Sequence, residues 1–254
     1  MRPGLKAGSI QFAFVLAMLV VWFAVTSIGA FHPLLLPEPG KVWAQMQRIA
    51  VNGALWKSAQ ATFYEIIVAY ILAAVPGLLI GFAVSRTRWA TRFFEPIFAA
   101  VFTVPLVLFF PLFIFFFGIG PNAKIAFGAV YAFFPIVLSA IAAFSGVDAL
   151  YVRGARSMGA STRQLFFKIY LPGALPGILN GLRIGAVICI ASVLGGETIS
   201  AAIGLGHSIA FAGEMLNSAE MYAWVFYVVF IVVVINKSLS AIESAAQRRT
   251  RQAG

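Results

Sequence analysis

The chain has 254 residues, of which 61% are hydrophobic and 10% are charged, and its net charge is +10. Soluble domains average about 45–50% apolar and about 25% charged residues, so this composition argues against a water-soluble fold and predicts an all-α, polytopic membrane domain. The single cysteine, Cys189, excludes an intrachain disulfide. The sequence has no phosphate-binding loop, nucleophile elbow or metal-ligand cluster, so we expect no catalytic or metal site in this chain.

Six apolar segments are each long enough to cross a bilayer, which takes about 20 helical residues. The first could instead be a signal peptide, but the apolar core of a signal peptide is only about 7–15 residues, and this favours an uncleaved span. A short amphipathic helix is expected over residues 46–56, between the first two spans. The predicted spans are residues 10–31, 59–85, 94–117, 122–146, 179–202 and 221–240.

The placement of Lys and Arg predicts the orientation, because cytoplasmic loops are enriched in these residues. With both termini inside, 14 of the 18 cations lie on the cytoplasmic side. The four others are Lys41, Arg48, Lys57 and Lys124. The positive charge is therefore read as a topology signal, and nucleic acid is not expected as a partner.

Residues 147–178, here called the 147–178 loop, form a polar island between two apolar segments. In this loop one anion, Asp148, faces four cations: Arg153, Arg156, Arg163 and Lys168. Residue chemistry alone leaves two interpretations open. The loop is either an amphipathic linker lying on lipid headgroups or a docking site for a soluble partner.

Local signals predict a helix–turn–helix structure for the 147–178 loop. Asp148 is placed to cap a helix over residues 149–158, which Gly159 would end in a left-handed conformation. Ser161 and Gln164 have the spacing of a capping box for a second helix. Pro172 is expected to stop that second helix, since proline has no N–H to donate.

Two acidic residues lie within predicted spans. Glu65 is near the start of its span, so we expect it to be interfacial. Glu197 is deep in an apolar segment, where an acid costs about 2.5–3.5 kcal/mol to insert. It is either structural, hydrogen-bonded to backbone or to Ser192 or Thr198, or it contacts a gate or substrate.

The 147–178 loop resembles the coupling loop of ABC importer permeases, whose pattern is E-A-A-x3-G-x9-I-x-L-P. Ala155, Gly159, Ile169, Leu171 and Pro172 fit this pattern at the right spacing. There are two departures. The usual Glu is replaced by Arg153, and the Ala that usually follows it is replaced by Gly154.

Other segments resemble the nitrate/sulfonate/taurine group of these permeases. The resemblance extends over about residues 33–243, and Phe116 stands where that group commonly has Trp. The matching segments are LPEPGKVW at residues 36–43, the Phe-rich stretch at 93–124, FFPI at 133–136, GVD at 146–148, and Glu197 followed by GLG at 204–206.

The resemblance implies one transmembrane permease domain over residues 1–254, with the type I importer permease fold and both termini in the cytoplasm. Its partners would be a dimer of ATP-binding cassette ATPases, a second permease copy, an extracytoplasmic solute-binding protein and the lipid bilayer. ATP and Mg would bind the ATPase, and this chain would be neither an enzyme nor a cofactor protein. It would sit in a bacterial inner membrane and move a small solute, such as a sulfonate, taurine, nitrate or aromatic acid.

The resemblance also assigns site residues. Tyr151, Ala155 and Met158 would share the face that docks in the ATPase, and the cations beside them would meet acidic groups there. The coupling set is Tyr151, Arg153, Ala155, Arg156, Met158, Gly159, Leu171 and Pro172. A pathway set is predicted from residue chemistry instead, because prolines free carbonyl groups that can face substrate or water, although the Phe members could equally be packing residues. This set is Pro105, Phe109, Phe110, Pro111, Phe113 and Glu197.

Two other classes compete with an importer permease. A proton-coupled secondary transporter would use Glu65 or Glu197 as its proton site, but it leaves the coupling-loop pattern unexplained. A structural membrane anchor gains little from the helix-breaking prolines in several spans.

Overall fold

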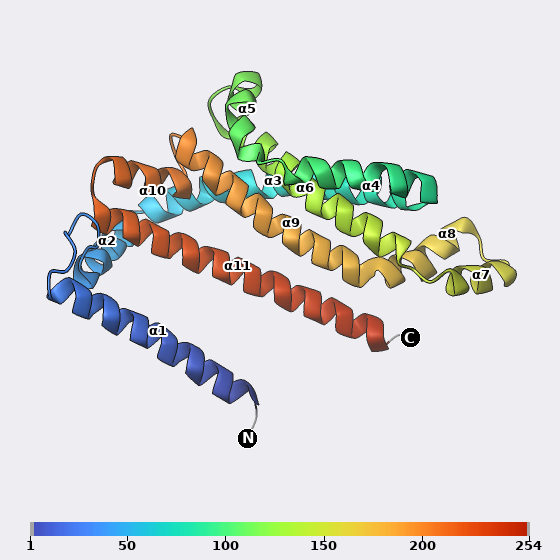
Figure 1. Ribbon diagram of the computed structural model, residues 1–254, viewed down its shortest axis with the longest axis horizontal. Helices are drawn as coiled ribbons and strands as arrows, with labels where there is room; N and C mark the ends of the chain where they lie inside the picture. The colour runs from blue at the N-terminus through green and yellow to red at the C-terminus, as the bar shows by residue number, and fades with distance from the viewer. Residues whose placement is uncertain (1–2, 253–254) are drawn as a thin grey trace.

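The computed structural model describes residues 3–252, and within them the regular structure is entirely helical (Figure 1). The elements of the first half are α1 (Pro3–Ser27), α2 (Pro39–Val51), α3 (Ala54–Ser85), α4 (Arg88–Thr103), η1 (Leu106–Phe109), α5 (Phe110–Phe117) and α6 (Pro121–Ser145). Those of the second half are α7 (Ala149–Ser157), α8 (Thr162–Leu165), η2 (Phe166–Tyr170), α9 (Leu171–Ile199), α10 (Leu205–Glu214) and α11 (Ser218–Gln252). The prediction of an all-α fold is confirmed.

Helix α6 is the centre of the bundle, with α3 on one side and α9 on the other. Small residues let these helices approach closely, as is usual in membrane bundles. A Cβ atom added to Gly81 of α3 would overlap Ala140 of α6, and one added to Gly185 of α9 would overlap Ile136. The tight packing therefore depends on glycines at the crossing points.

Four helices in the described residues are long and apolar enough to cross a membrane. They comprise residues 54–85, 121–145, 162–199 and 218–241. Helix α1 has a shorter apolar stretch over Ala13–Ser27. Its side chains are largely exposed, except near Trp22, whose indole donates to the Pro37 carbonyl oxygen at 3.1 Å.

The predicted span over residues 94–117 is broken. Helix α4 and the following η1–α5 segment are long and apolar enough to cross a membrane only when taken together, and they are bent by 75° relative to each other. The bend is at Val104 and Pro105, where Val104 is extended (φ −68°, ψ 131°) because the residue before a proline avoids the helical conformation.

The amphipathic helix expected over residues 46–56 is also shifted, since α2 begins at Pro39 and ends at Val51.

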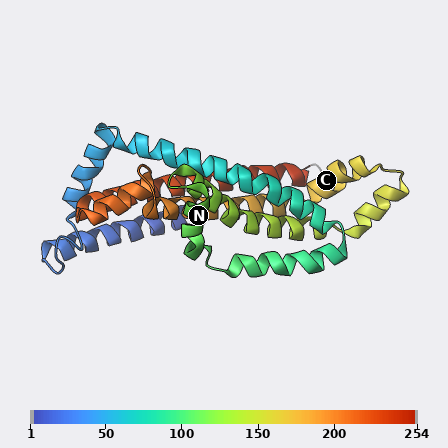
Figure 2. The same cartoon turned by 90° about the horizontal axis from the view of Figure 1, so that it is seen from above.

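The local structure of the 147–178 loop follows its sequence signals. The Asp148 carboxylate accepts a hydrogen bond from the Leu150 N–H at 2.8 Å and caps α7. Gly159 has φ +79°, as its position after the helix requires. Ser161 and Gln164 form the expected capping box. This loop lies at one end of the long axis, and α2 and α10 lie at the other (Figures 1 and 2).

The expectation that Pro172 stops the second helix is wrong. Helical structure continues without a gap over residues 162–199, through α8, η2 and α9, although the chain bends between α8 and α9 (Figure 1). The π-helical turn of η2 resolves the problem, because the Leu171 N–H donates to the Phe166 oxygen five residues back. Pro172 follows at the start of α9, so the residue that lacks an N–H lies directly after the widened turn.

Candidate functional site

A buried charge cluster joins the centre of the bundle to α10. We define it as Glu65 of α3, Lys124 of α6 and Glu197 of α9, which are 3%, 2% and 1% exposed. The Lys124 ammonium lies 2.5 Å from the Glu65 carboxylate. Glu197 lies within electrostatic range of both. The Glu65 side chain is thus enclosed by protein, and its expected place near the membrane interface stays a prediction.

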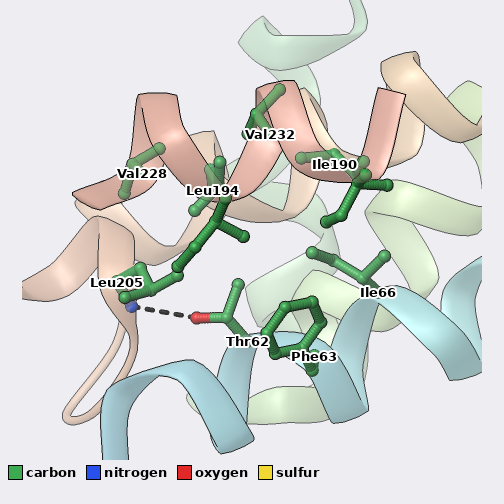
Figure 3. A pocket seen from close by; sticks show the side chains of 10 residues that line it. Thr62, Phe63, Ile66, Ile190, Leu194, Leu205, Val228 and Val232 are labelled. Atoms are coloured by element: carbon green, nitrogen blue, oxygen red, sulfur yellow. Dashed lines mark hydrogen bonds between the residues drawn. The ribbon is translucent and has the colours of Figure 1, made fainter. Parts of the chain in front are cut away.

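Hydrogen bonds tie Glu197 to α3 and to the start of α10. One carboxylate oxygen accepts from the Thr62 hydroxyl at 2.6 Å, and the other accepts from the Gly206 N–H at 2.7 Å. Thr62 in turn accepts from the Leu205 N–H at 2.9 Å (Figure 3). Two of the free N–H groups at the N-terminus of α10 are therefore satisfied by side chains from other helices.

The expected partners of Glu197 were only partly right. Backbone does bind it, through Gly206, but Ser192 and Thr198 donate instead to carbonyl groups of their own helix. Thr62 and Lys124 were missed. The sequence did contain a signal for Lys124. An acid in an apolar segment requires a partner, and Lys124 is a cation at the edge of another apolar segment, so the two could have been paired.

Charge burial explains why the three groups lie together. An isolated buried charge is costly, and only pairing and hydrogen bonding make it tolerable. The pocket in Figure 3, lined by Thr62, Phe63, Leu194 and Leu205 among others, presents an apolar wall of α3, α9 and α11 beside the cluster. The cluster thus connects three helices and the start of α10 inside an apolar environment.

The pathway candidates separate into two groups. Phe110 is fully buried, and its ring lies 5.1 Å from that of Phe127. A Cβ atom on Gly196 would lie 3.0 Å from the Phe110 ring and 3.2 Å from Lys124, so Phe110 is next to the charge cluster. Phe113 is half-buried, and its ring is 5.5 Å from that of Phe127. Pro105, Phe109 and Pro111 are exposed on this subunit.

The coupling candidates lie at the opposite end from α10. Tyr151 and Met158 are 66% and 88% exposed, whereas Val152 is buried and fastens α7 to the rest of the chain. Ala155 is half-buried. Of the others, Arg153, Arg156 and Gly159 are exposed, and Leu171 and Pro172 are half-buried at the start of α9.

This architecture defines a polytopic membrane protein whose apolar bundle ends in an exposed, capped helical loop. The chain belongs to the family of binding-protein-dependent transport system inner membrane components, whose family model matches residues 66–252. It is an ABC importer permease of the taurine/sulfonate type, and such permease subunits are not themselves enzymes.

Among curated proteins, the chain is similar to the taurine transport system permease protein TauC of Escherichia coli K12. The two are 32% identical over 231 residues, which cover 89% of this chain and 84% of TauC. The putative aliphatic sulfonates transport permease protein SsuC of the same organism is 30% identical, with 79% of this chain and 76% of SsuC covered. The SsuC protein of Bacillus subtilis 168 is 27% identical, with 85% and 78% covered.

The fold is similar to that of a solved transporter. An inward-facing crystal structure of the MetNI methionine ABC transporter superposes with a TM-score of 0.61 at 22% identity. The match covers 79% of this chain and 97% of the MetNI chain. It shows that the two chains share a fold.

Proposed function

We propose that this permease moves a small organic sulfonate, such as the zwitterion taurine or an alkanesulfonate anion. The names of the similar permeases, TauC and SsuC, support this solute class. Nitrate or an aromatic acid is the broader alternative. Uptake of radiolabelled taurine by cells that carry the complete importer tests the proposal. We expect unlabelled taurine and alkanesulfonates to reduce this uptake by competition, and the absence of competition would contradict the proposal.

The observation that carries the coupling part of the proposal is the exposure of α7. Single exposed apolar residues are common, but a group of them marks an interaction site, and Leu150, Tyr151 and Met158 are all exposed at α7. In our proposal this face docks in a groove of the ATPase, with Arg153 and Arg156 beside acidic groups. Because Arg153 replaces the family's usual Glu, α7 would present a positive instead of a negative charge to the ATPase at this position.

The complete importer would contain two permease copies, an ATPase dimer that binds ATP and Mg, and an extracytoplasmic solute-binding protein. A homodimer of this chain is the simplest form of the permease pair. In the proposed orientation both termini and the 147–178 loop face the cytoplasm of a bacterium. The exposed apolar side chains of α1, including Phe14, Leu19 and Phe23, would then contact lipid or the second copy.

Two substitutions test the docking of α7. Ala155→Asp places a charge on the docking face, and Gly159→Pro is incompatible with φ +79° because proline fixes φ near −65°. Each variant is expected to lose solute uptake and solute-stimulated ATPase activity by tenfold or more while still inserting in the membrane.

Gly154→Ala is the matched control. It restores the residue usual in the family, and an added Cβ meets nothing within 4 Å. Ala in place of a helical Gly stabilises by roughly 0.5–1 kcal/mol, so uptake should be preserved. Normal uptake in both Ala155→Asp and Gly159→Pro would rule out the docking role.

Glu197→Gln separates the importer from a proton-coupled transporter. Gln can preserve the network: its amide N–H donates to Thr62, whose hydroxyl turns to the Ser58 carbonyl oxygen 3.1 Å away, and its oxygen accepts from Gly206. We expect uptake within about twofold of wild type in Glu197→Gln, and a strong loss in Glu197→Ala. Loss of uptake in a stably folded Glu197→Gln variant would favour a proton site.

A further inference from the structure

Five arginines converge on one cavity at the end of the bundle that carries α7. The cavity has a volume of about 550 Å³. Three of the arginines come from the α3–α4 junction, where Arg86 ends α3 and Arg88 and Arg92 lie in the first turns of α4, and two come from α7. Residues about 65 positions apart in sequence therefore face the same space. They are Arg86, Arg88, Arg92, Arg153 and Arg156, and the wall also includes the hydroxyl-bearing Ser85, Thr91, Ser145 and Tyr170.

Among the side chains that the structure describes, no ion pair neutralises these arginines. The ion pairs formed by the described residues use Lys41, Lys124 and Arg183 as cations. Asp148 is close in sequence to α7, but its carboxylate caps that helix. Five guanidinium groups around one cavity without a carboxylate in its wall create a site for a polyvalent or strongly charged anion.

An aromatic cavity of about 410 Å³ adjoins the arginine cavity and shares Arg86 and Arg156 with it. Its wall includes Phe82, Phe166 and Phe167, together with a further cation, Arg163. The ring of Phe82 lies 4.8 Å from that of Phe166, and the Arg86 guanidinium lies 5.8 Å from the Phe82 ring. The combined space therefore has guanidinium groups in both parts, and aromatic rings line the second part as well.

We propose that the two cavities form one binding site for an anionic phospholipid. The phosphate would bind the arginines, whose planar guanidinium groups match phosphate oxygens bidentately. The first part of an acyl chain would lie along the phenylalanines. A free phosphate would use only the guanidinium groups, whereas a phospholipid would use the aromatic rings as well. Basic pockets at the ends of membrane helices are suited to such headgroups.

The site goes beyond the transport function, and it gives the coupling loop a second contact. Both α7 and the α3–α4 junction contribute arginines, so one lipid phosphate would hold these two segments together. Their mutual repulsion would be relieved at the same time. Each guanidinium has five N–H donors, so Arg153 and Arg156 can contact the phosphate and an acidic group of the ATPase at the same time.

Lipid titration of the purified, delipidated importer complex tests this site by native mass spectrometry. We compare dioleoyl phosphatidylglycerol with dioleoyl phosphatidylcholine, and then add inorganic phosphate as a competitor. The variant Arg86→Gln/Arg88→Gln/Arg92→Gln removes exposed side chains, so the fold should be preserved. Its affinity for phosphatidylglycerol should fall roughly fivefold for each arginine removed.

Two further variants sharpen the result. Arg48→Gln/Lys57→Gln removes exposed cations distant from the cavity and should bind phosphatidylglycerol like the wild type. Phe167→Gln changes the apolar wall at an exposed position and should weaken phosphatidylglycerol severalfold. Unchanged lipid binding by Phe167→Gln, together with full competition by millimolar phosphate, would show a free-anion site and overturn the lipid assignment.

Other outcomes also decide the matter. Equal binding of the two lipids, or unchanged phosphatidylglycerol binding in the triple variant, would overturn the proposal. Loss of ATPase co-purification in the triple variant with unchanged lipid binding would assign the arginines to a protein interface instead. Solute uptake by the wild type is measured in a separate experiment. A result that overturns the lipid site would therefore leave the proposed transport function unaffected.

Discussion

The variant Lys124→Met is expected to lower the stability of the folded protein by about 3–5 kcal/mol, the cost of removing one partner from a buried ion pair. Glu65 would lose the ammonium 2.5 Å away, although it would remain only 3% exposed. Glu197 would lose the same nearby cation. Thermal melting of the purified protein in detergent, followed by fluorescence-detected size exclusion, measures the loss.

The double variant Glu65→Met/Lys124→Met is the control for this prediction. Replacing both partners of a buried pair with apolar residues of similar size is often neutral or stabilising. We therefore expect the double variant to melt well above Lys124→Met. Equal melting of Lys124→Met and the wild type would show that the ion pair contributes nothing to the fold.

The second large effect is expected for Gly204→Ala. Gly204 has φ +146° and ψ 166°, a conformation that costs a residue with a side chain about 1–3 kcal/mol. The added Cβ would also overlap the carboxylate of Glu197. The start of α10 must then move away from Glu197, so both the melting temperature and solute uptake should fall strongly.

Gly195→Ala is the matched control for Gly204→Ala. Gly195 lies in α9, two residues from Glu197, and a Cβ there meets nothing within 4 Å. Its substitution should leave uptake unchanged and keep or slightly raise the melting temperature. Similar losses in the two variants would mean that the local geometry of Gly204 has no special role.

Local signals predicted much of the 147–178 loop. The Asp148 cap, the left-handed Gly159 and the Ser161–Gln164 capping box are formed by residues close in sequence, so short-range rules suffice for them. The same rules were wrong for Pro172. A π-turn shifts the hydrogen-bond register by one residue, and nothing in the spacing of the residues announces that shift.

The charge cluster required information that one sequence does not supply. Glu65 and Lys124 are 59 positions apart, and Thr62 and Glu197 are 135 apart. The sequence indicated that an acid within an apolar segment needs a partner. It did not indicate which helices would lie close enough to supply that partner. The bend at Pro105 was similarly hidden, because proline is tolerated within many membrane helices and only packing decides whether the chain turns there.

The length of α9 has a mechanical consequence. It has 29 residues, so at 1.5 Å per residue it is roughly 43 Å long. A tilt of only about 5° at the end near α8 displaces the far end by roughly 4 Å. The end near α8 carries Pro172, and the far end carries Glu197. A small rotation at the 147–178 loop would therefore become a displacement of several ångströms at the distant carboxylate of Glu197.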